Sequence, residues 1–163
     1  MTYKLNVAGL ERDLPLCPLN DNLTIAAFVI FGDVELTCAC AAELLKKAPE
    51  FDCMVAPEAK AIPLIHEMAR QSGRNEYFLV RKNKKAYMDG ADAKKMAGKR
   101  VLIIDDAIST GGSIKAVEHL VEKAGGIVAG RMAILAEGDA RDRTDITYLE
   151  YLPLFNSKGE PLA

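Results

Sequence analysis

The chain has 163 residues, of which 50% are hydrophobic and 27% are charged, and its formal net charge is −2 at pH 7. This length and composition indicate one globular domain that spans residues 1–163. The small negative charge argues against non-specific binding of nucleic acid, which requires a basic surface. No apolar run reaches membrane-spanning length and the N-terminus does not resemble a signal peptide, so we expect a cytoplasmic protein without a membrane or nucleic-acid partner.

The first thirty residues predict irregular structure, because Pro15 and Pro18 interrupt them. The tripeptide Asn-Asp-Asn at residues 20–22 favours a turn. Residues 23–31 are apolar and are compatible with either a strand or a short helix.

The rest of the chain alternates between helical and strand patterns. Helices are predicted over residues 34–47, 60–71, 92–96 and 112–124. Strands are predicted over residues 51–56, 76–81, 101–104, 127–135 and 146–152. This alternation predicts βαβ units with right-handed crossovers, and therefore a single α/β domain built on a parallel sheet.

Residues 101–113 carry the most specific pattern of the chain, Val-Leu-Ile-Ile-Asp-Asp-Ala-Ile-Ser-Thr-Gly-Gly-Ser. The four apolar β-formers at its start predict a strand that is buried on both faces of a parallel sheet. Asp105 and Asp106 follow at the point where the carboxyl end of such a strand would reach solvent. Ligands of open α/β sheets bind at this edge, so the two carboxylates are candidate site residues.

The residues that follow the carboxylates suit a phosphate. Gly111 and Gly112 let the backbone approach a ligand closely, and the free N–H groups at the start of the next helix favour an anion. The hydroxyls of Ser109, Thr110 and Ser113 can donate to the same oxygens. The carboxylates would repel a phosphate and suit ribose hydroxyls or a hydrated Mg²⁺ instead. The alternative is an ordinary βα turn, in which the glycines only tighten the loop.

This segment resembles, at all thirteen positions, the signature with which type I phosphoribosyltransferases bind 5-phosphoribosyl-1-pyrophosphate (PRPP). The resemblance implies the α/β, single-domain, parallel-sheet fold of that family, with a small N-terminal hood over residues 1–32 that recognises the base. It implies that Asp105 and Asp106 are the catalytic pair and that residues 109–113 bind the 5-phosphate. The implied cofactor is Mg²⁺, held mainly by PRPP and water near the two aspartates, without a direct protein ligand.

Two other segments resemble the pyrophosphate-binding elements of adenine phosphoribosyltransferases. Glu58, Ala59 and Lys60 match a Glu-Ala-Arg-Gly loop, with lysine in place of the arginine and alanine in place of the glycine. Lysine keeps the positive charge but loses bidentate recognition. Arg81 and Lys82 match an Arg-Lys pair at the end of the following strand. The resemblance implies that the three cations converge on the pyrophosphate.

The segment Gly-Leu-Glu-Arg-Asp at residues 9–13 resembles the Phe-Arg-Asp segment in the hood of adenine phosphoribosyltransferases. By this resemblance Leu10 and Arg12 would flank the purine, and Arg12 would contact it largely through its backbone. The match covers only two or three identities, and a plain surface loop is the alternative.

One family element is short in this chain. Members carry a mobile loop and hairpin between the Arg-Lys pair and the signature strand, but only 18 residues, 83–100, occupy that place here. Either the chain is a naturally short-looped member, such as a weak enzyme or a binding module, or the loop is absent from this sequence near residues 87–89.

The resemblance favours a Mg²⁺-dependent enzyme of purine salvage, a pentosyl-transferring glycosyltransferase that converts adenine and PRPP into AMP and pyrophosphate. The alternatives are an enzyme for xanthine, hypoxanthine-guanine or orotate, and a regulator that senses PRPP without catalysis. The resemblance also implies a homodimer.

Other reactive side chains predict nothing specific. The cysteines form no C-x-x-C pair, which favours buried, reduced thiols over zinc or a disulfide. They are Cys17, Cys38, Cys40 and Cys53. His66 and His119 lie in predicted helices and are expected to pack or to face solvent. The charged run at residues 137–143 is expected to be a solvated loop, which lies near the site because it follows a strand.

Overall fold

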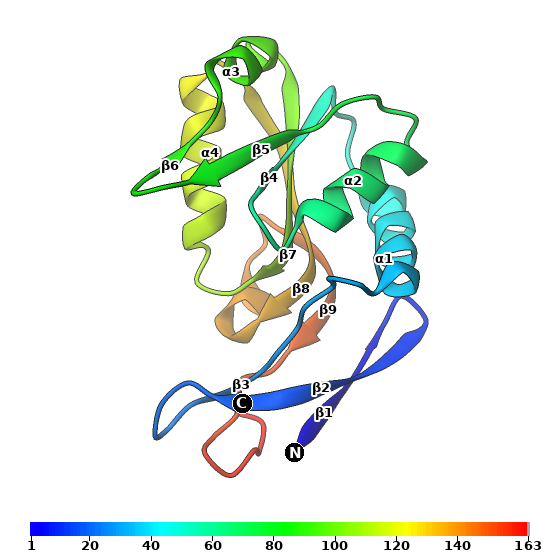
Figure 1. Ribbon diagram of the computed structural model, residues 1–163, viewed down its shortest axis with the longest axis vertical. Coiled ribbons are helices and arrows are strands. Elements are labelled where there is room, and N and C mark those ends of the chain that lie inside the picture. The colour runs from blue at the N-terminus through cyan, green and yellow to red at the C-terminus, as the bar shows by residue number, and fades with distance from the viewer. Residues whose placement is uncertain (163) are drawn as a thin grey trace.

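The computed structural model describes residues 1–162 (Figure 1). It contains a six-stranded sheet with helices on both faces and a separate three-stranded antiparallel sheet. In chain order the elements are β1 (Thr2–Val7), β2 (Leu10–Pro18), β3 (Thr24–Ala26), α1 (Val34–Lys47), β4 (Cys53–Pro57), α2 (Ile62–Gln71), β5 (Phe78–Lys82), β6 (Ala86–Tyr87), α3 (Gly90–Met96), β7 (Arg100–Ile108), α4 (Gly112–Lys123), β8 (Ile127–Glu137), the 3₁₀ helix η1 (Gly138–Asp142) and β9 (Thr147–Leu152).

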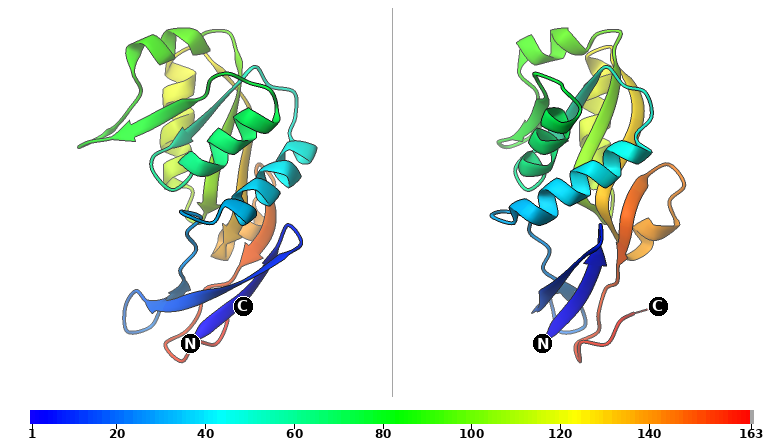
Figure 2. Two further views of the ribbon diagram at one scale, coloured as in Figure 1. Left: turned by 45° about the vertical axis from the view of Figure 1, so that its right-hand side comes forward. Right: turned by 90° about the vertical axis from the view of Figure 1, so that its right-hand side faces the viewer.

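The large sheet has the strand order β6-β5-β4-β7-β8-β9. Neighbouring strands from β5 to β9 pair in parallel, and only β6 is antiparallel, in a hairpin with β5. Helices α1 and α2 cover one face of this sheet and α4 covers the other (Figure 2). The predicted α/β domain with a mainly parallel sheet is confirmed.

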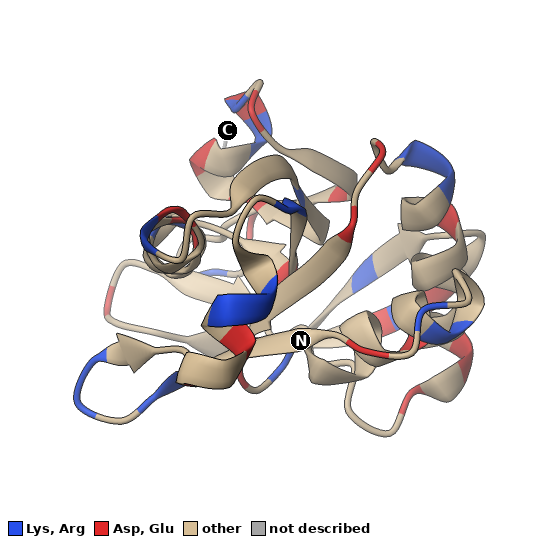
Figure 3. Ribbon diagram, turned by 90° about the horizontal axis from the view of Figure 1, so that it is seen from above, with Lys and Arg blue, Asp and Glu red and all other residues tan. Residues whose placement is uncertain are grey.

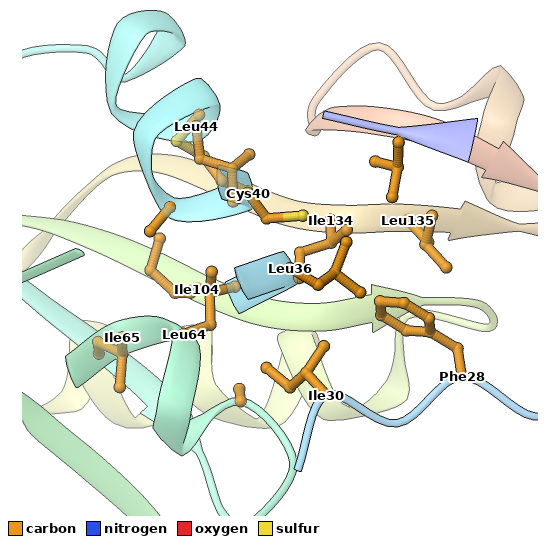
Figure 4. Packing of buried hydrophobic residues seen from close by; sticks show 14 of the residues in the cluster. Phe28, Ile30, Leu36, Cys40, Leu44, Leu64, Ile65, Ile104, Ile134 and Leu135 are labelled. Carbon is orange, nitrogen blue, oxygen red and sulfur yellow. The ribbon is translucent and has the colours of Figure 1, made fainter. Parts of the chain in front are cut away.

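Two apolar cores lie on opposite faces of β7. Leu102 and Ile104 belong to the core beneath α1 and α2, whereas Val101 and Ile103 belong to the core beneath α4. All four side chains have no exposed surface, which explains why the strand is apolar without alternation. Figure 4 shows Ile104 among the side chains contributed by α1 and α2, with Leu36 nearby. The central strand is therefore held from both sides up to the point where its carboxylates begin.

The N-terminal sheet, β1 to β3, corrects the prediction of irregular structure over the first thirty residues. β1 and β2 form a hairpin whose turn, Ala8 and Gly9, has positive φ at both residues, as two-residue hairpins require. The sequence does not predict this turn, because residues 8 and 9 are not the Asn-Gly or Asp-Gly pair that is usual in such hairpins. Pro15 and Pro18 are accommodated within β2, and the carbonyl of Pro15 accepts a hydrogen bond from the N–H of Ala27.

The N-terminal sheet lies below the carboxyl ends of β7, β8 and β9, together with the C-terminal segment (Figure 1). Phe155 bridges to Thr24 in antiparallel fashion and is 1% exposed. Its ring meets that of Tyr3 edge to face, with centroids 5.2 Å apart. The two ends of the chain thus form one cover over this edge of the large sheet.

Several element boundaries differ from the predictions. β7 continues through the two aspartates to Ile108 and does not end at residue 104. The helix predicted from residue 60 begins at Ile62, because Pro63 occupies its first turn. Residues 138–142, predicted as part of a solvated loop, form η1. Cys17 is exposed, so the prediction of buried thiols is wrong for this residue. No helix within residues 1–162 is long and apolar enough to cross a membrane.

Substitution of Leu102 by alanine should lower the free energy of unfolding by about 2–5 kcal/mol, because it leaves a cavity in a strand packed on both faces. The matched control is Leu19→Ala, at a leucine that is 59% exposed, which should change stability by less than about 0.5 kcal/mol. Urea unfolding of both variants measures the difference. Equal stability of the two variants would contradict this description of the core.

Candidate functional site

An acidic pair, Asp105 and Asp106, lies in the second half of β7. Each residue is only 7% exposed, although the sequence placed them where the strand would reach solvent. The N–H of Asp106 donates to Oδ1 of Asp105 at 2.8 Å. Burial, followed by the neighbouring carboxylate of Asp106, raises the pKa of Asp105 well above its usual range. The pair is therefore held on a rigid strand at a cost in electrostatic energy.

Lys60 and Glu137 face the same cluster of charges. Glu137 ends β8, the strand beside β7, and is half-buried. Burial raises the pKa of Glu137, the charge of Lys60 opposes this shift, and that of Asp106 adds to it. Lys60 also opposes the pKa shift of Asp105. The sequence analysis placed Glu137 near the site, as the first residue of the charged run 137–143, but gave it no contact with the acidic pair.

The glycine- and hydroxyl-rich segment forms a small cavity at the start of α4. Gly111 has φ +80° and precedes Gly112, the first residue of the helix. Glycine adopts this left-handed conformation without a steric penalty. The cavity has a volume of about 50 Å³ and is lined by Asp105, Ala107, Ile108, Ser109, Thr110, Gly111, Gly112, Ser113 and Ile114. All five predicted 5-phosphate residues thus share one cavity with Asp105 of the acidic pair.

A larger cavity of about 580 Å³ separates the β5–β6 hairpin from the start of α4. It is lined by Pro57, Glu58, Val80, Lys82, Lys84, Lys85, Ala86, Thr110, Gly112, Ser113, Ala116 and Val117. Oε1 of Glu58 accepts a hydrogen bond from the backbone N–H of Lys82 at 2.8 Å, and the peptide bond between Glu58 and Ala59 is cis. Lysines make the tip of this hairpin basic (Figure 3, lower left). The structure thus brings Glu58 and Lys82 next to the phosphate-type cavity.

Arg81 lies elsewhere. It lines a different cavity of about 470 Å³ together with Tyr77, Leu79, Tyr87, Asp89 and Asp92. Because successive side chains of a strand point to opposite faces, Arg81 and Lys82 cannot face the same side of β5. The strand alternation could have shown this in advance. The three cations expected to converge on pyrophosphate therefore occupy different surroundings within the described chain: Lys82 the larger cavity, Lys60 the acidic cluster and Arg81 the opposite face.

The two residues expected to flank a base connect the N-terminal sheet to α1. Arg12 donates to both carboxylate oxygens of Asp33, at 2.7 and 3.1 Å, and to Glu35 at 2.8 Å. Asp33 also caps α1 by accepting from the N–H of Leu36 at 3.1 Å, and the Arg12 guanidinium lowers its pKa. Leu10 packs against the core beneath α1. The side chain of Arg12 is thus engaged within the protein, and its backbone lies in the β1–β2 ladder opposite Leu5. A contact from Arg12 to a base stays a prediction.

A mainly parallel sheet with an acidic pair and a small cavity at the start of a helix, both at one edge, places this chain among α/β proteins whose sites lie at the carboxyl ends of their strands. Comparison with known proteins gives the family: residues 39–158 match the model of the phosphoribosyl transferase domain, and the chain belongs to this family. The fold is that of its type I members.

Among curated relatives, an adenine phosphoribosyltransferase of Kosmotoga olearia is 34% identical over 156 residues, which cover 80% of this chain and 87% of the relative. An orotate phosphoribosyltransferase of Thermococcus kodakarensis is 28% identical over 70% of this chain and 62% of the relative. The chain spans between 50% and 62% of the length of the first three curated relatives, all orotate phosphoribosyltransferases.

Among solved structures, an adenine phosphoribosyltransferase of Thermoanaerobacter pseudethanolicus superposes with a TM-score of 0.70 at 25% identity, covering 85% of this chain and 95% of that one. The adenine phosphoribosyltransferase of Saccharomyces cerevisiae, solved with adenine, gives a TM-score of 0.64 at 21% identity, covers 84% of this chain and 91% of that one, and shares the fold.

Substitution of Asp105 by asparagine should make the pH dependence of stability shallower. Because the folded-state pKa of Asp105 is raised, the proton it retains stabilises the folded chain fully at low pH, and this contribution is lost as the pH rises through the raised pKa. The free energy of unfolding of the unmodified chain should therefore fall relative to that of Asp105→Asn between about pH 4, the pKa of an aspartate in the unfolded chain, and the raised pKa of about 8, and should change little above it.

Urea unfolding across this pH range measures the difference, with the exposed Asp21→Asn as the control. A stability difference between Asp105→Asn and the unmodified chain that does not change with pH would contradict the raised pKa.

Proposed function

We propose that the protein is a Mg²⁺-dependent purine-salvage phosphoribosyltransferase that converts adenine and PRPP into AMP and pyrophosphate. One observation supports this above all others: Asp105 and the residues 109–113 line one cavity at the carboxyl edge of the sheet. A carboxylate that accepts from hydroxyls and a set of N–H and O–H donors for phosphate are what a ribose 5-phosphate group needs at its two ends.

The proposed chemistry is the transfer of the phosphoribosyl group to a ring nitrogen of the base as the bond from C1 to pyrophosphate breaks. Asp105 and Asp106 would exchange hydrogen bonds with the ribose hydroxyls, and the negative charge that the pair carries would lie near the cationic ribose ring of the transition state. Backbone N–H groups and hydroxyls of residues 109–113 would hold the 5-phosphate. Positioning and electrostatics would then supply most of the rate.

The proposed pyrophosphate residues are Glu58, Ala59, Lys60, Arg81 and Lys82. Glu58 would fix the backbone of Lys82 through its hydrogen bond, so that the lysine faces the leaving group. Lys60 would reach the same anion from the side of the acidic cluster. Arg81, which faces away from the larger cavity, is the least supported member of this set.

Mg²⁺ is proposed as the ion that accompanies PRPP. It would neutralise the pyrophosphate and be held mainly by PRPP and water, and the oxygens of Asp105 and Asp106 would accept hydrogen bonds from its hydration shell. The donor set therefore fits the ion without a dedicated protein cage.

Adenine is the proposed base, with Leu10 and Arg12 as its proposed contacts in a hood that spans residues 1–32 of a single domain, 1–163. The Kosmotoga olearia relative and the Thermoanaerobacter pseudethanolicus structure, both adenine phosphoribosyltransferases matched over most of their length, support this choice. Orotate is the second candidate, because the first three curated relatives are orotate phosphoribosyltransferases.

A homodimer in the cytoplasm is proposed as the working form. Large apolar side chains on the surface support a partner surface, since Phe31 is 53% exposed, Val34 is 72% exposed and Tyr87 is 46% exposed.

Pyrophosphate release should be observed when the protein is incubated with PRPP, Mg²⁺ and adenine, and should be absent with orotate, guanine, hypoxanthine or xanthine. A coupled pyrophosphate assay with each base makes the comparison. Turnover of orotate or of another purine without turnover of adenine would overturn the proposed base. Binding of PRPP without turnover of any base would make the protein a PRPP sensor.

The double variant Asp105→Asn/Asp106→Asn should lose at least about 10³-fold in turnover while it remains folded, because it removes the charge that faces the ribose. The control is Asp142→Asn, at a side chain that is 81% exposed and lies beyond the end of β8. Steady-state rates and circular dichroism test both variants. Undiminished turnover in the double variant would show that the acidic pair is not the catalytic site.

A further inference from the structure

The cavity proposed for the 5-phosphate lacks a cation of its own. Residues 107–113 contain neither lysine nor arginine, and Asp105 forms part of the wall. A phosphate monoester carries a charge of about −1.5 to −2 at neutral pH, whereas a helix N-terminus offers only about half a positive charge. The lysines of the β5–β6 hairpin line the neighbouring larger cavity, so a positive group at the turn itself would add to the charge that holds the phosphate.

Arg143 is placed to supply that charge. It follows η1, and its backbone N–H donates to the carbonyl of Ala140 at the end of this turn. Its Nη1 lies so close to Gly111 that a Cβ on this glycine would collide with it. Glycine at position 111 is favoured by its left-handed φ, and the guanidinium of Arg143 packs against it where a Cβ would otherwise project.

The guanidinium is oriented by an ion pair on its far side. Nε and Nη2 donate to the two carboxylate oxygens of Asp145 at 2.9 and 2.7 Å. Nη1 donates no hydrogen bond to any residue in the described part of the chain, 1–162. The Arg143–Asp145 pair therefore turns its positive end toward the loop and its negative end away from it.

Neighbouring residues hold the Arg143–Asp145 pair beside α4. A groove of about 400 Å³ runs along the helix from the loop, and its walls include Thr110, Gly111, Lys115, His119 and Arg143. Behind it, Arg131 of β8 pairs with Glu118 of α4. The helix that begins the anion cavity is thus tied to β8, the strand that leads into η1 and Arg143.

We propose that Arg143 is a positioning residue for the 5-phosphate: it holds the turn at Gly111 from outside the cavity and adds the positive charge that the loop lacks. This inference rests on the proposed function. No earlier step requires Arg143, which the sequence places in a solvated, mixed-charge run near the site without a role of its own.

The experiment compares Arg143→Ala and Arg143→Lys with Arg141→Ala. Arg141 is the matched control, because it lies two residues away, is 43% exposed and stacks over Tyr151, with 5.0 Å between its Cζ and the ring centroid. Isothermal titration calorimetry measures the affinity of each variant for ribose 5-phosphate, which carries the 5-phosphate, and for pyrophosphate, which does not. Steady-state kinetics with PRPP and the accepted base give KM and kcat.

Arg143→Ala should weaken ribose 5-phosphate binding and raise the KM for PRPP by about fivefold at low salt, with pyrophosphate affinity and kcat changed by less than about twofold. The loss should shrink as salt screens the charge, and Arg143→Lys should recover affinity to within about twofold. Arg141→Ala should behave as the unmodified protein does.

Unchanged ribose 5-phosphate affinity in folded Arg143→Ala overturns the inference. A loss of ribose 5-phosphate affinity that does not depend on salt and is not restored in Arg143→Lys also overturns it, because Arg143 would then support the local structure without contributing charge. Failure of the unmodified protein to bind ribose 5-phosphate and PRPP would instead refute the proposed function, so the two failures are distinguishable.

Discussion

The structure is organised around two neighbouring carboxylates that the fold buries. Asp105 and Asp106 are each 7% exposed in a strand whose preceding residues are packed on both faces. Burying two like charges together is unfavourable, and the raised pKa of Asp105 expresses this cost. The apolar cores that contain Ile103 and Ile104 stabilise β7 enough to offset this electrostatic cost. Because the strand is rigid, it fixes the positions of the two carboxylates.

The rest of the site can be understood as compensation for that charge. The positive charge of Lys60 favours the ionised forms of Asp105 and Glu137. The start of α4 presents backbone N–H groups beside the acidic pair. Arg143 lies against the outer side of the turn at Gly111. Negative groups that accept hydroxyls and positive groups that hold anions therefore alternate over a short distance, which suits a ligand with a sugar between two phosphate-bearing ends.

Sequence reasoning succeeded where the signal was local. The apolar run before Asp105 identified a strand buried on both faces, and the glycine-hydroxyl segment forms a cavity beside Asp105, whose use for phosphate stays a prediction. It did not identify which distant residues meet. The ion pair of Arg12 with Asp33 has no trace in sequence spacing, and the position of the run 137–143 after a strand indicated nearness to the site but not the contact of Arg143 with Gly111. The hairpin turn at residues 8–9 was not predicted, because alanine rarely adopts the positive φ that this turn needs.

A crystal structure of the protein with ribose 5-phosphate tests the central claim most directly. The claim predicts phosphate oxygens within hydrogen-bond distance of the backbone N–H groups of residues 110–113 and ribose hydroxyls against the oxygens of Asp105 and Asp106. A sugar phosphate bound elsewhere in the protein, with the acidic pair facing only solvent or protein, would contradict it.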